Sequence, residues 1–316
     1  MFETPLFWAL LLASAAFFRV AGDRRVRARA AALAAAGVVA VVLIVGLNVG
    51  LVAYLVAASL WVYFGLKLTR GLGGRRPYVA SFLVFLPVVV PWVAGKQSAA
   101  LAWKPLDFLY FVGFSFFLIK AWTLIKDYHD GRVARLDPFV VVAYFLFFPA
   151  YIAGPMHYYG EFDATLREPA KLDGEAVVDV VFRALLGLVK IKLVAALLTP
   201  VSLEALKAPG AIITARRVVA GSFAYSFVIL ADFSGYSDLA IATSRVVGIR
   251  TPENFNYPYA AANIREFWQR WHVTFSRVLT SYIFVPVSRR LNVSFGGRRT
   301  SVLVASHLLT FLFCGY

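Results

Sequence analysis

The sequence has 316 residues, of which 60% are hydrophobic and only 16% charged, with a mean hydropathy of +0.73. Soluble domains carry about 25% charged residues, so the composition excludes an ordinary soluble domain and predicts an all-α, polytopic membrane protein. The net charge of +15 does not indicate nucleic acid, because the arginines gather in short loops between apolar runs. One cysteine, Cys314, excludes an intrachain disulfide, and no Cys/His spacing in the sequence suggests a metal site.

Apolar segments follow one another along the chain with short breaks. Arginines follow the first segment, 5–20, and no basic residue precedes it, which predicts a transmembrane helix and not a cleavable leader. Several segments are shorter than the roughly 20 residues of a straight span, so we expect some to be broken or re-entrant. The expected helices, about ten in number, cover 5–20, 30–46, 48–66, 78–94, 106–126, 138–154, 176–199, 217–232, 236–248 and 300–316.

Three loops are rich in basic residues: 19–29, 67–77 and 126–137. Because two expected spans separate each loop from the next, the positive-inside rule places all three in the cytoplasm and the N-terminus outside. Orientation is the main role expected for these arginines. A further hypothesis is that they attract an acidic carrier protein.

Two stretches, 147–175 and 250–263, contain several prolines and asparagines and are not expected to be helical spans. Between them, the acids Asp232 and Asp238 lie in an apolar region on either side of a Ser-Gly-Tyr-Ser sequence. Six residues is not a same-face spacing on a helix, so a catalytic carboxylate pair is not supported. We expect a broken helix whose freed backbone groups are satisfied by these acids.

Polar residues are unusually dense in NIREFWQRWHVTFSR, residues 263–277. Asn263 with Glu266 three residues later predicts a helix start. In a continuous helix, aromatic residues would share one face, and Arg265, Gln269, His272 and Ser276 would form a polar stripe on another. The stripe indicates either the lining of a wet cavity or, as the alternative, an Arg-Trp anchor at the membrane interface.

Three motifs in order carry a family resemblance: DFSGYSDLAI at 232–241, PENFN at 252–256 and FWQRWHVTFS at 267–276. With them the chain resembles the membrane-bound O-acyltransferase family, and within it the bacterial branch of teichoic acid D-alanyl transfer proteins and alginate-type O-acetyltransferases. FFPAYIAGP at 147–155 and GLVKIKLVAALL at 187–198 resemble other segments of the family. The resemblance implies one membrane domain over 1–316, most motif-rich over 222–316, with its helices around a central tunnel.

The resemblance also implies which residues act. His272, of the Arg-Trp-His motif, would be catalytic, helping to deprotonate or orient an acceptor hydroxyl. A second family histidine is expected just after Tyr316, so we expect the chain to be truncated at its C-terminus; His307 does not match that histidine and is interpreted as a structural or interfacial residue. Residues expected to line the substrate tunnel are Asn254, Asn256, Arg265, Trp268, Gln269 and Ser276, of which Arg265 and Gln269 are assigned from helical phase and not from the resemblance.

The function implied is transfer of an acyl group, acetyl or D-alanyl, from a cytoplasmic thioester to hydroxyls of an exported cell-envelope polysaccharide. The donor would be a co-substrate, on the phosphopantetheine of an acyl carrier protein or on coenzyme A, with no bound cofactor and no metal. An extracytoplasmic partner transferase is a further possibility, and the expected location is the bacterial cytoplasmic (inner) membrane. The alternatives are a transporter or channel with broken polar helices, or a family member that acylates a lipid or protein.

Overall fold

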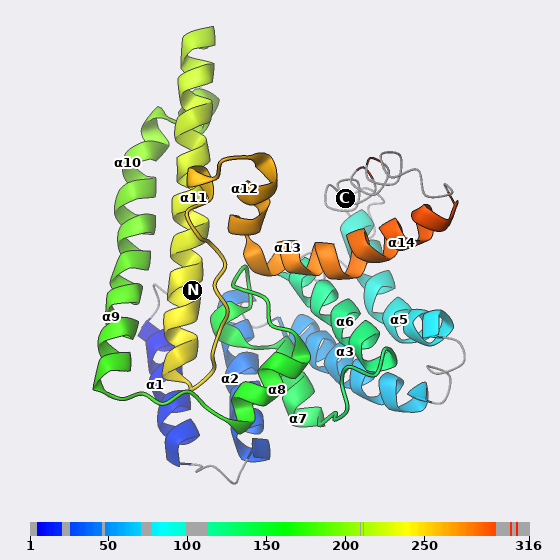
Figure 1. The fold of residues 1–316 in the computed structure, drawn as a ribbon. Coiled ribbons are helices and arrows are strands. Elements are labelled where there is room, and N and C mark those ends of the chain that lie inside the picture. Colours follow the sequence, from blue (N-terminus) through cyan, green and yellow to red (C-terminus); the bar gives the residue numbers. More distant parts are fainter. Residues whose placement is uncertain are drawn as a thin grey trace. The chain divides into compact units, whose positions relative to one another are not determined.

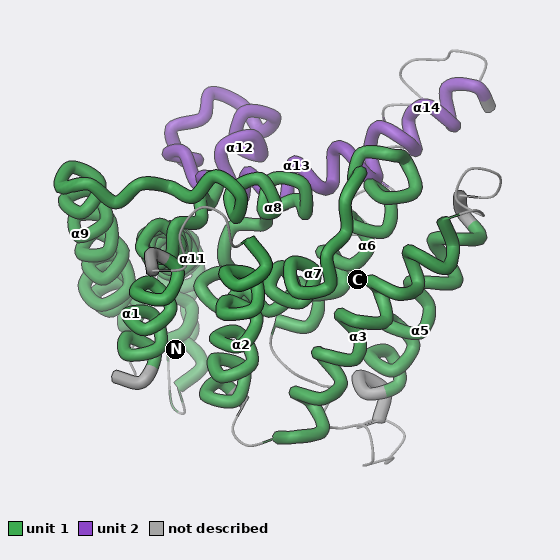
Figure 2. Tube along the Cα trace, turned by 90° about the horizontal axis from the view of Figure 1, so that it is seen from below, with its two compact units in different colours: residues 1–252 green, residues 253–316 purple. Residues whose placement is uncertain are grey.

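The computed structural model describes residues 5–20, 26–45, 48–70, 77–98, 113–208, 210, 212–294, 304 and 308. All regular structure among these residues is helical, as the composition predicts. The chain divides into two compact units, unit 1 (Met1–Pro252) and unit 2 (Glu253–Tyr316) (Figure 2).

Unit 1 consists of helices that pack against both adjacent and distant segments of the chain (Figure 1). Helix α2 packs against α1 and α7, α3 against α5 and α7, α5 against α6, and α9 against α11. The helices are α1 (Pro5–Val20), α2 (Val26–Val45), α3 (Val49–Leu68), α5 (Pro77–Ser98), α6 (Phe114–His129), α7 (Pro138–Phe145), η2 (Phe148–Ala150), α8 (Tyr159–Arg167), α9 (Gly174–Val189), η3 (Lys190–Ala195), α10 (Ala196–Leu198), η4 (Thr199–Val201), η5 (Leu203–Lys207) and α11 (Ala215–Val246).

Three of the described helices are long and apolar enough to cross a membrane. Further apolar helices are shorter, and the predicted segment 300–316 lies outside the described residues except for residues 304 and 308. The helices agree with a membrane protein, but the expected number of about ten spans stays a prediction. The three long helices cover Val26–Ile44, Val49–Leu68 and Ala215–Val246, and the shorter ones Phe7–Phe18, Val79–Ala94 and Pro138–Ala150.

The prediction of a broken helix around the Ser-Gly-Tyr-Ser sequence is wrong, because α11 runs without interruption through it. The glycine of this sequence serves close packing and not a turn. A Cβ added at Gly235 would lie 2.8 Å from the carbonyl oxygen of Gly187 on α9. A Cβ added at Gly187 would lie 2.8 Å from the carbonyl oxygen of Gly235. Two facing glycines thus let the backbones of α9 and α11 approach closely, which the pattern of apolar residues alone does not reveal.

The two acids of α11 do not satisfy freed backbone groups, since the helix is intact. Asp238 is buried and accepts hydrogen bonds from two cations of the neighbouring segment, Arg183 Nε at 3.1 Å and Lys190 Nζ at 2.6 Å. Asp232 is exposed on α11. Asp238 therefore ties α11 to α9 and η3 beside the glycine contact.

Aromatic side chains fill the centre of unit 1 around α6, α7 and η2. The rings of Phe117 and Phe145 stack with centroids 4.5 Å apart, and the fully buried Tyr144 donates a hydrogen bond to the carbonyl oxygen of His157. The buried Lys120 donates to the Tyr144 carbonyl oxygen at 2.8 Å. This core fixes the segment between α6 and α8, including the loop that precedes α7.

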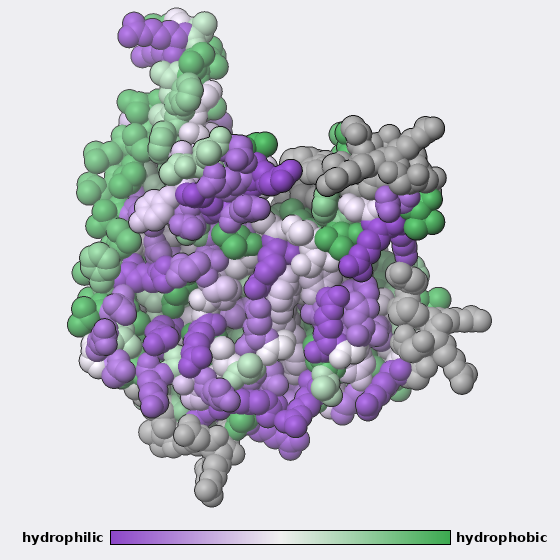
Figure 3. All heavy atoms as spheres, viewed as in Figure 1, coloured by the Kyte–Doolittle hydropathy of each residue, from purple (hydrophilic) through white to green (hydrophobic). Residues whose placement is uncertain are grey.

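Exposed apolar side chains gather on α9 and α11. Figure 3 shows hydrophobic residues along these helices at the left of the view. On α9, Val178 is 67% exposed and Phe182 68% exposed, and on α11 Phe223 is 69% exposed. Faces of this kind are expected where a helix meets lipid.

Candidate functional site

Unit 2 carries the motif that the sequence singles out. Its helix α12 begins where predicted, because the Asn263 side chain accepts a hydrogen bond from the backbone N–H of Glu266 at 3.0 Å. The Glu266 carboxylate accepts from the N–H of Ala262, the residue before the N-cap, at 2.7 Å, which ties the entering chain to the first turn of α12. The helices of unit 2 are η6 (Pro258–Ala260), α12 (Ile264–Arg270), α13 (Val273–Leu279), η7 (Thr280–Phe284) and α14 (Val285–Ser294).

The prediction of one continuous helix across the motif is wrong, because the helix ends at the histidine. Trp271 is extended, and His272 has φ 44° and ψ 54°, in the left-handed region. A non-glycine residue there carries about 1–2 kcal/mol of backbone strain. The polar stripe is therefore split: Arg265 and Gln269 lie on α12, whereas Ser276 lies on α13 after the break.

Asn254, in the loop before α12, holds the break in place. Its side chain is fully buried, and Oδ1 lies 2.9 Å from His272 Nδ1 and accepts a hydrogen bond from Thr274 Oγ1 at 2.9 Å. Asn254 also accepts hydrogen bonds from the first two backbone N–H groups of α13. Its backbone oxygen accepts from the N–H of Val273 at 2.9 Å, and its side-chain Oδ1 accepts from the N–H of Thr274 at 3.4 Å. The cap that His272 itself does not provide is thus supplied by the preceding loop.

These contacts determine where the proton of the imidazole lies. A backbone N–H can only donate, so the Asn254 atom that faces the N–H of Thr274 must be the amide oxygen. That oxygen can only accept, so His272 Nδ1 carries a hydrogen and donates it to Asn254. In the neutral imidazole the lone pair is then on Nε2.

The ring of His272 is also held from the side. It stacks on the ring of Phe275, with centroids 5.1 Å apart and an interplanar angle of 29°. The side chain is half-buried, and desolvation lowers the pKa of the His272 imidazole below its usual value near 6.5. Together with the tautomer, this makes His272 a neutral hydrogen-bond acceptor at physiological pH.

The other predicted lining residues lie in different surroundings. Arg265, Trp268 and Gln269 are exposed on α12, with Trp268 42% exposed. Ser276 is half-buried and donates from Oγ to the carbonyl oxygen of Trp271 at 3.2 Å, which supports the break. The side chain of Asn256 is exposed, and the backbone N–H of this residue donates to the backbone carbonyl oxygen of Arg270 at 2.9 Å. The His272 ring is thus contacted by Asn254, through the hydrogen bond at Nδ1, and by Phe275, through stacking.

The aromatic residues of the motif pack on one another within unit 2. The ring of Trp271 stacks on Phe267 with centroids 5.7 Å apart and meets the ring of Phe255 edge-on at 5.2 Å. These contacts join the loop at Phe255 to α12.

Sequence reasoning missed Thr274, a buried residue whose hydroxyl donates to the same Asn254 oxygen as His272. Its place in the first turn of α13 becomes recognisable only once the break at His272 is known. Within the described residues, no three His, Cys, Asp or Glu side chains come together as a metal site would require.

Comparison with known proteins identifies the family. The model of the membrane-bound O-acyltransferase family matches residues 79–316, which include the whole of the candidate site. The chain belongs to this family, as the three motifs predict.

Similar proteins are bacterial. A teichoic acid D-alanyltransferase of Streptococcus thermophilus is 27% identical over 283 residues, covering 85% of this chain and 65% of that protein. A probable alginate O-acetylase of Pseudomonas fluorescens is 31% identical over 267 residues, covering 81% of this chain and 50% of that protein. A peptidoglycan O-acetyltransferase of Helicobacter pylori is 42% identical over 97 residues, which are 30% of this chain and 17% of that protein. The chain thus spans between half and two thirds of the first two relatives.

Proposed function

We propose that this chain is an acyltransferase that moves an acyl group, acetyl or D-alanyl, from a thioester donor to hydroxyl groups of an exported cell-envelope polysaccharide. The family supports acyl transfer, and the three relatives are named for transfer to teichoic acid, alginate or peptidoglycan. The observation that carries the proposal is the hydrogen bond from His272 Nδ1 to the buried Asn254, because it leaves Nε2 as a base.

In the proposed reaction, His272 Nε2 accepts the proton of an acceptor hydroxyl as its oxygen attacks the thioester carbonyl carbon. The carbon–oxygen bond forms, the carbon–sulfur bond breaks, and the leaving thiolate takes a proton back from the imidazolium. Asn254 stabilises the imidazolium only through its amide dipole, so the proton is readily returned. General base catalysis of this kind contributes about 10²–10⁴-fold to a rate.

The remaining features of the reaction are part of the same proposal. The donor is a cytoplasmic thioester on an acyl carrier protein or coenzyme A, and the protein lies in the bacterial inner membrane with the acceptor outside. The exposed polar residues of α12, Gln269 three residues and Arg265 seven residues before His272, are available to contact substrate. A central tunnel through which the acyl group crosses the bilayer would explain why such a motif occurs in an apolar chain.

The test is covalent product formation in proteoliposomes that contain the purified protein. Labelled acetyl-coenzyme A, or a carrier protein loaded with labelled D-alanine, is supplied on one side and a hydroxyl-rich polysaccharide on the other. An alkali-labile label on the polysaccharide, lost in His272→Ala but retained in the exposed control Arg289→Gln, supports the acyltransferase. Movement of unreacted label across the membrane without ester formation would instead indicate a transporter.

A further inference from the structure

A pocket of about 1050 Å³ lies in unit 1, far along the chain from the His272 motif. Its lining comes from the start of α2, the end of α3, the end of α6, the loop before α7 and the end of α8. Residues from all three basic loops that the sequence predicts to be cytoplasmic therefore meet in one place. Ligand pockets commonly have volumes of about 300–1000 Å³, so this one has room for a headgroup with part of its glycerol backbone.

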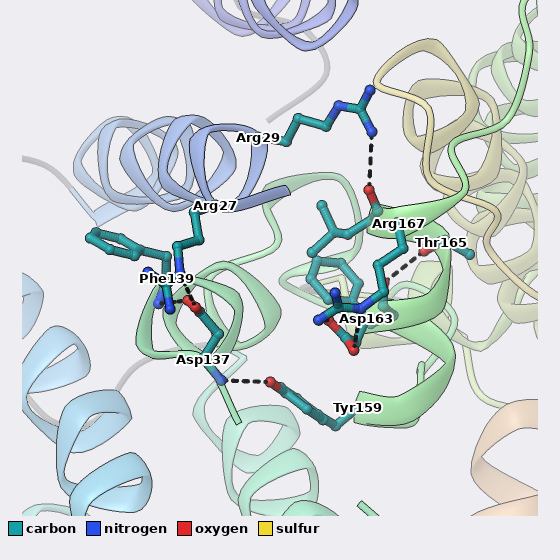
Figure 4. Close-up of polar contacts among 10 residues, drawn as sticks. Arg27, Arg29, Asp137, Phe139, Tyr159, Asp163, Thr165 and Arg167 are labelled. Carbon is teal, nitrogen blue, oxygen red and sulfur yellow. Dashed lines mark hydrogen bonds and ion pairs between the residues drawn. The ribbon is translucent and has the colours of Figure 1, made fainter. Parts of the chain in front are cut away.

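The lining of the pocket is strongly cationic, with a single carboxylate, Asp137. Two of the cations are already compensated (Figure 4): Arg27 Nε donates to Asp137 at 2.8 Å, and Arg167 forms two hydrogen bonds of 2.9 Å with Asp163. The pocket's cations are Arg27, Lys67, Arg70, Arg135 and Arg167.

Three cations of the pocket are left without a carboxylate partner among the residues that the structure describes. Lys67 lies over the ring of Tyr63 at 4.6 Å, which leaves its charge in place, and Arg70 and Arg135 are exposed. A pocket with this excess of positive charge is suited to a phosphate-bearing anion.

The place of the pocket relative to the spans favours one source of phosphate. The candidate spans Val26–Ile44 and Val49–Leu68 are consecutive, so the start of the first and the end of the second face the same side of the membrane. Arg27 and Lys67 lie at these two ends, and Arg70 follows directly. The pocket is therefore at the depth of the lipid headgroups, where basic residues attract anionic lipids.

We propose that this pocket binds the phosphate headgroup of an anionic phospholipid at the cytoplasmic surface. This site is separate from the proposed acyl transfer and does not depend on it. Lys67, Arg70 and Arg135 contact the phosphate, while the Arg27–Asp137 pair closes one side of the pocket.

The test is lipid binding to the purified, full chain in detergent, measured by native mass spectrometry. The probe is short-chain phosphatidylglycerol, compared with phosphatidylcholine of equal chain length and with glycerol 3-phosphate. The double variant Arg70→Gln/Arg135→Gln removes two uncompensated cations from the pocket. Its matched control, Arg216→Gln/Arg217→Gln, removes two exposed arginines from the start of α11. Thermal unfolding checks that both remain folded.

The proposal predicts that phosphatidylglycerol binds more tightly than either comparator, and that the pocket variant binds it roughly 30-fold more weakly, from about 1 kcal/mol for each cation. The control should stay within about twofold of the wild type. Equal losses in both variants would overturn the proposal, because they would show attraction by net charge alone. Equal binding of glycerol 3-phosphate would assign the pocket to a free phosphate compound, and displacement of the lipid by poly-glutamate at matched charge would assign it to an acidic protein.

Discussion

Replacing Asn254 by alanine removes the group that sets the conformation and tautomer of His272. The amide oxygen takes part in two hydrogen bonds of 2.9 Å and a longer one of 3.4 Å, and the residue is fully buried. A buried hydrogen bond contributes about 1 kcal/mol, and each donor left unsatisfied in the interior costs about 1–3 kcal/mol. We therefore expect Asn254→Ala to lower the free energy of unfolding by about 3 kcal/mol.

The effect of this substitution on catalysis should exceed its effect on stability. Without Asn254, either imidazole nitrogen can carry the hydrogen, and the ring is free to rotate away from the acceptor hydroxyl. Misplacement of a catalytic group by about 1 Å can cost 10²-fold in rate. We expect kcat for acyl transfer to fall roughly 10- to 100-fold at a temperature where the variant is still folded, measured with labelled donor alongside thermal unfolding.

Thr274→Val is the matched control for this prediction. It removes a hydroxyl that shares the same oxygen but leaves the contact between His272 and Asn254 intact. The expected result is a loss of about 1 kcal/mol in stability with kcat nearly unchanged. The reasoning is refuted if Asn254→Ala keeps the wild-type kcat, or if Thr274→Val loses as much kcat as Asn254→Ala.

Further predictions concern the contact between α9 and α11 and the pH dependence. Gly235→Ala should destabilise unit 1 by about 1–3 kcal/mol, since its Cβ meets a backbone oxygen at 2.8 Å, whereas Gly160→Ala, with open space around it, should be neutral or stabilising in thermal unfolding. Asp238→Asn removes the carboxylate charge that Arg183 and Lys190 share and should cost about 2–3 kcal/mol in the same assay; an unchanged midpoint would show that these two ion pairs do not contribute to stability. Because the pKa of His272 is lowered, its base form persists as the pH falls through 6.5, so kcat/KM should stay level between pH 8 and 6.5; a rate already halved at pH 6.5 would contradict this.

Much of the helical framework is predictable from the sequence because it depends on local composition. The segment 5–20 is observed as α1 with the same bounds, and 176–199 is observed as the run from α9 to α10. The start of α12 is also local, since an N-cap needs only Asn263 and Glu266 at the correct spacing. Family membership follows from three motifs in order, which do not depend on knowing how they fold.

The candidate site is less predictable because it depends on contacts between segments. A helical wheel places Ser276 beside Gln269, but the left-handed backbone at His272 separates them, and nothing in the local sequence reveals a strained histidine. The hydrogen bond between Asn254 and His272 joins residues 18 apart, on either side of α12. Likewise, the sequence around Gly235 in α11 predicts a turn, whereas in the structure this glycine lies at a close contact between two helices. The difference depends on Gly187 of α9, which is distant in the sequence.

The central claim is that His272, held by Asn254 with its lone pair on Nε2, is the base in acyl transfer. The most direct measurement is the single-turnover rate of label transfer from the thioester to the polysaccharide in His272→Gln, whose amide has similar size but is not basic. The account predicts a rate at least 100-fold below that of the wild type at a temperature where thermal unfolding shows the variant to be folded. A rate within threefold of the wild type would contradict it.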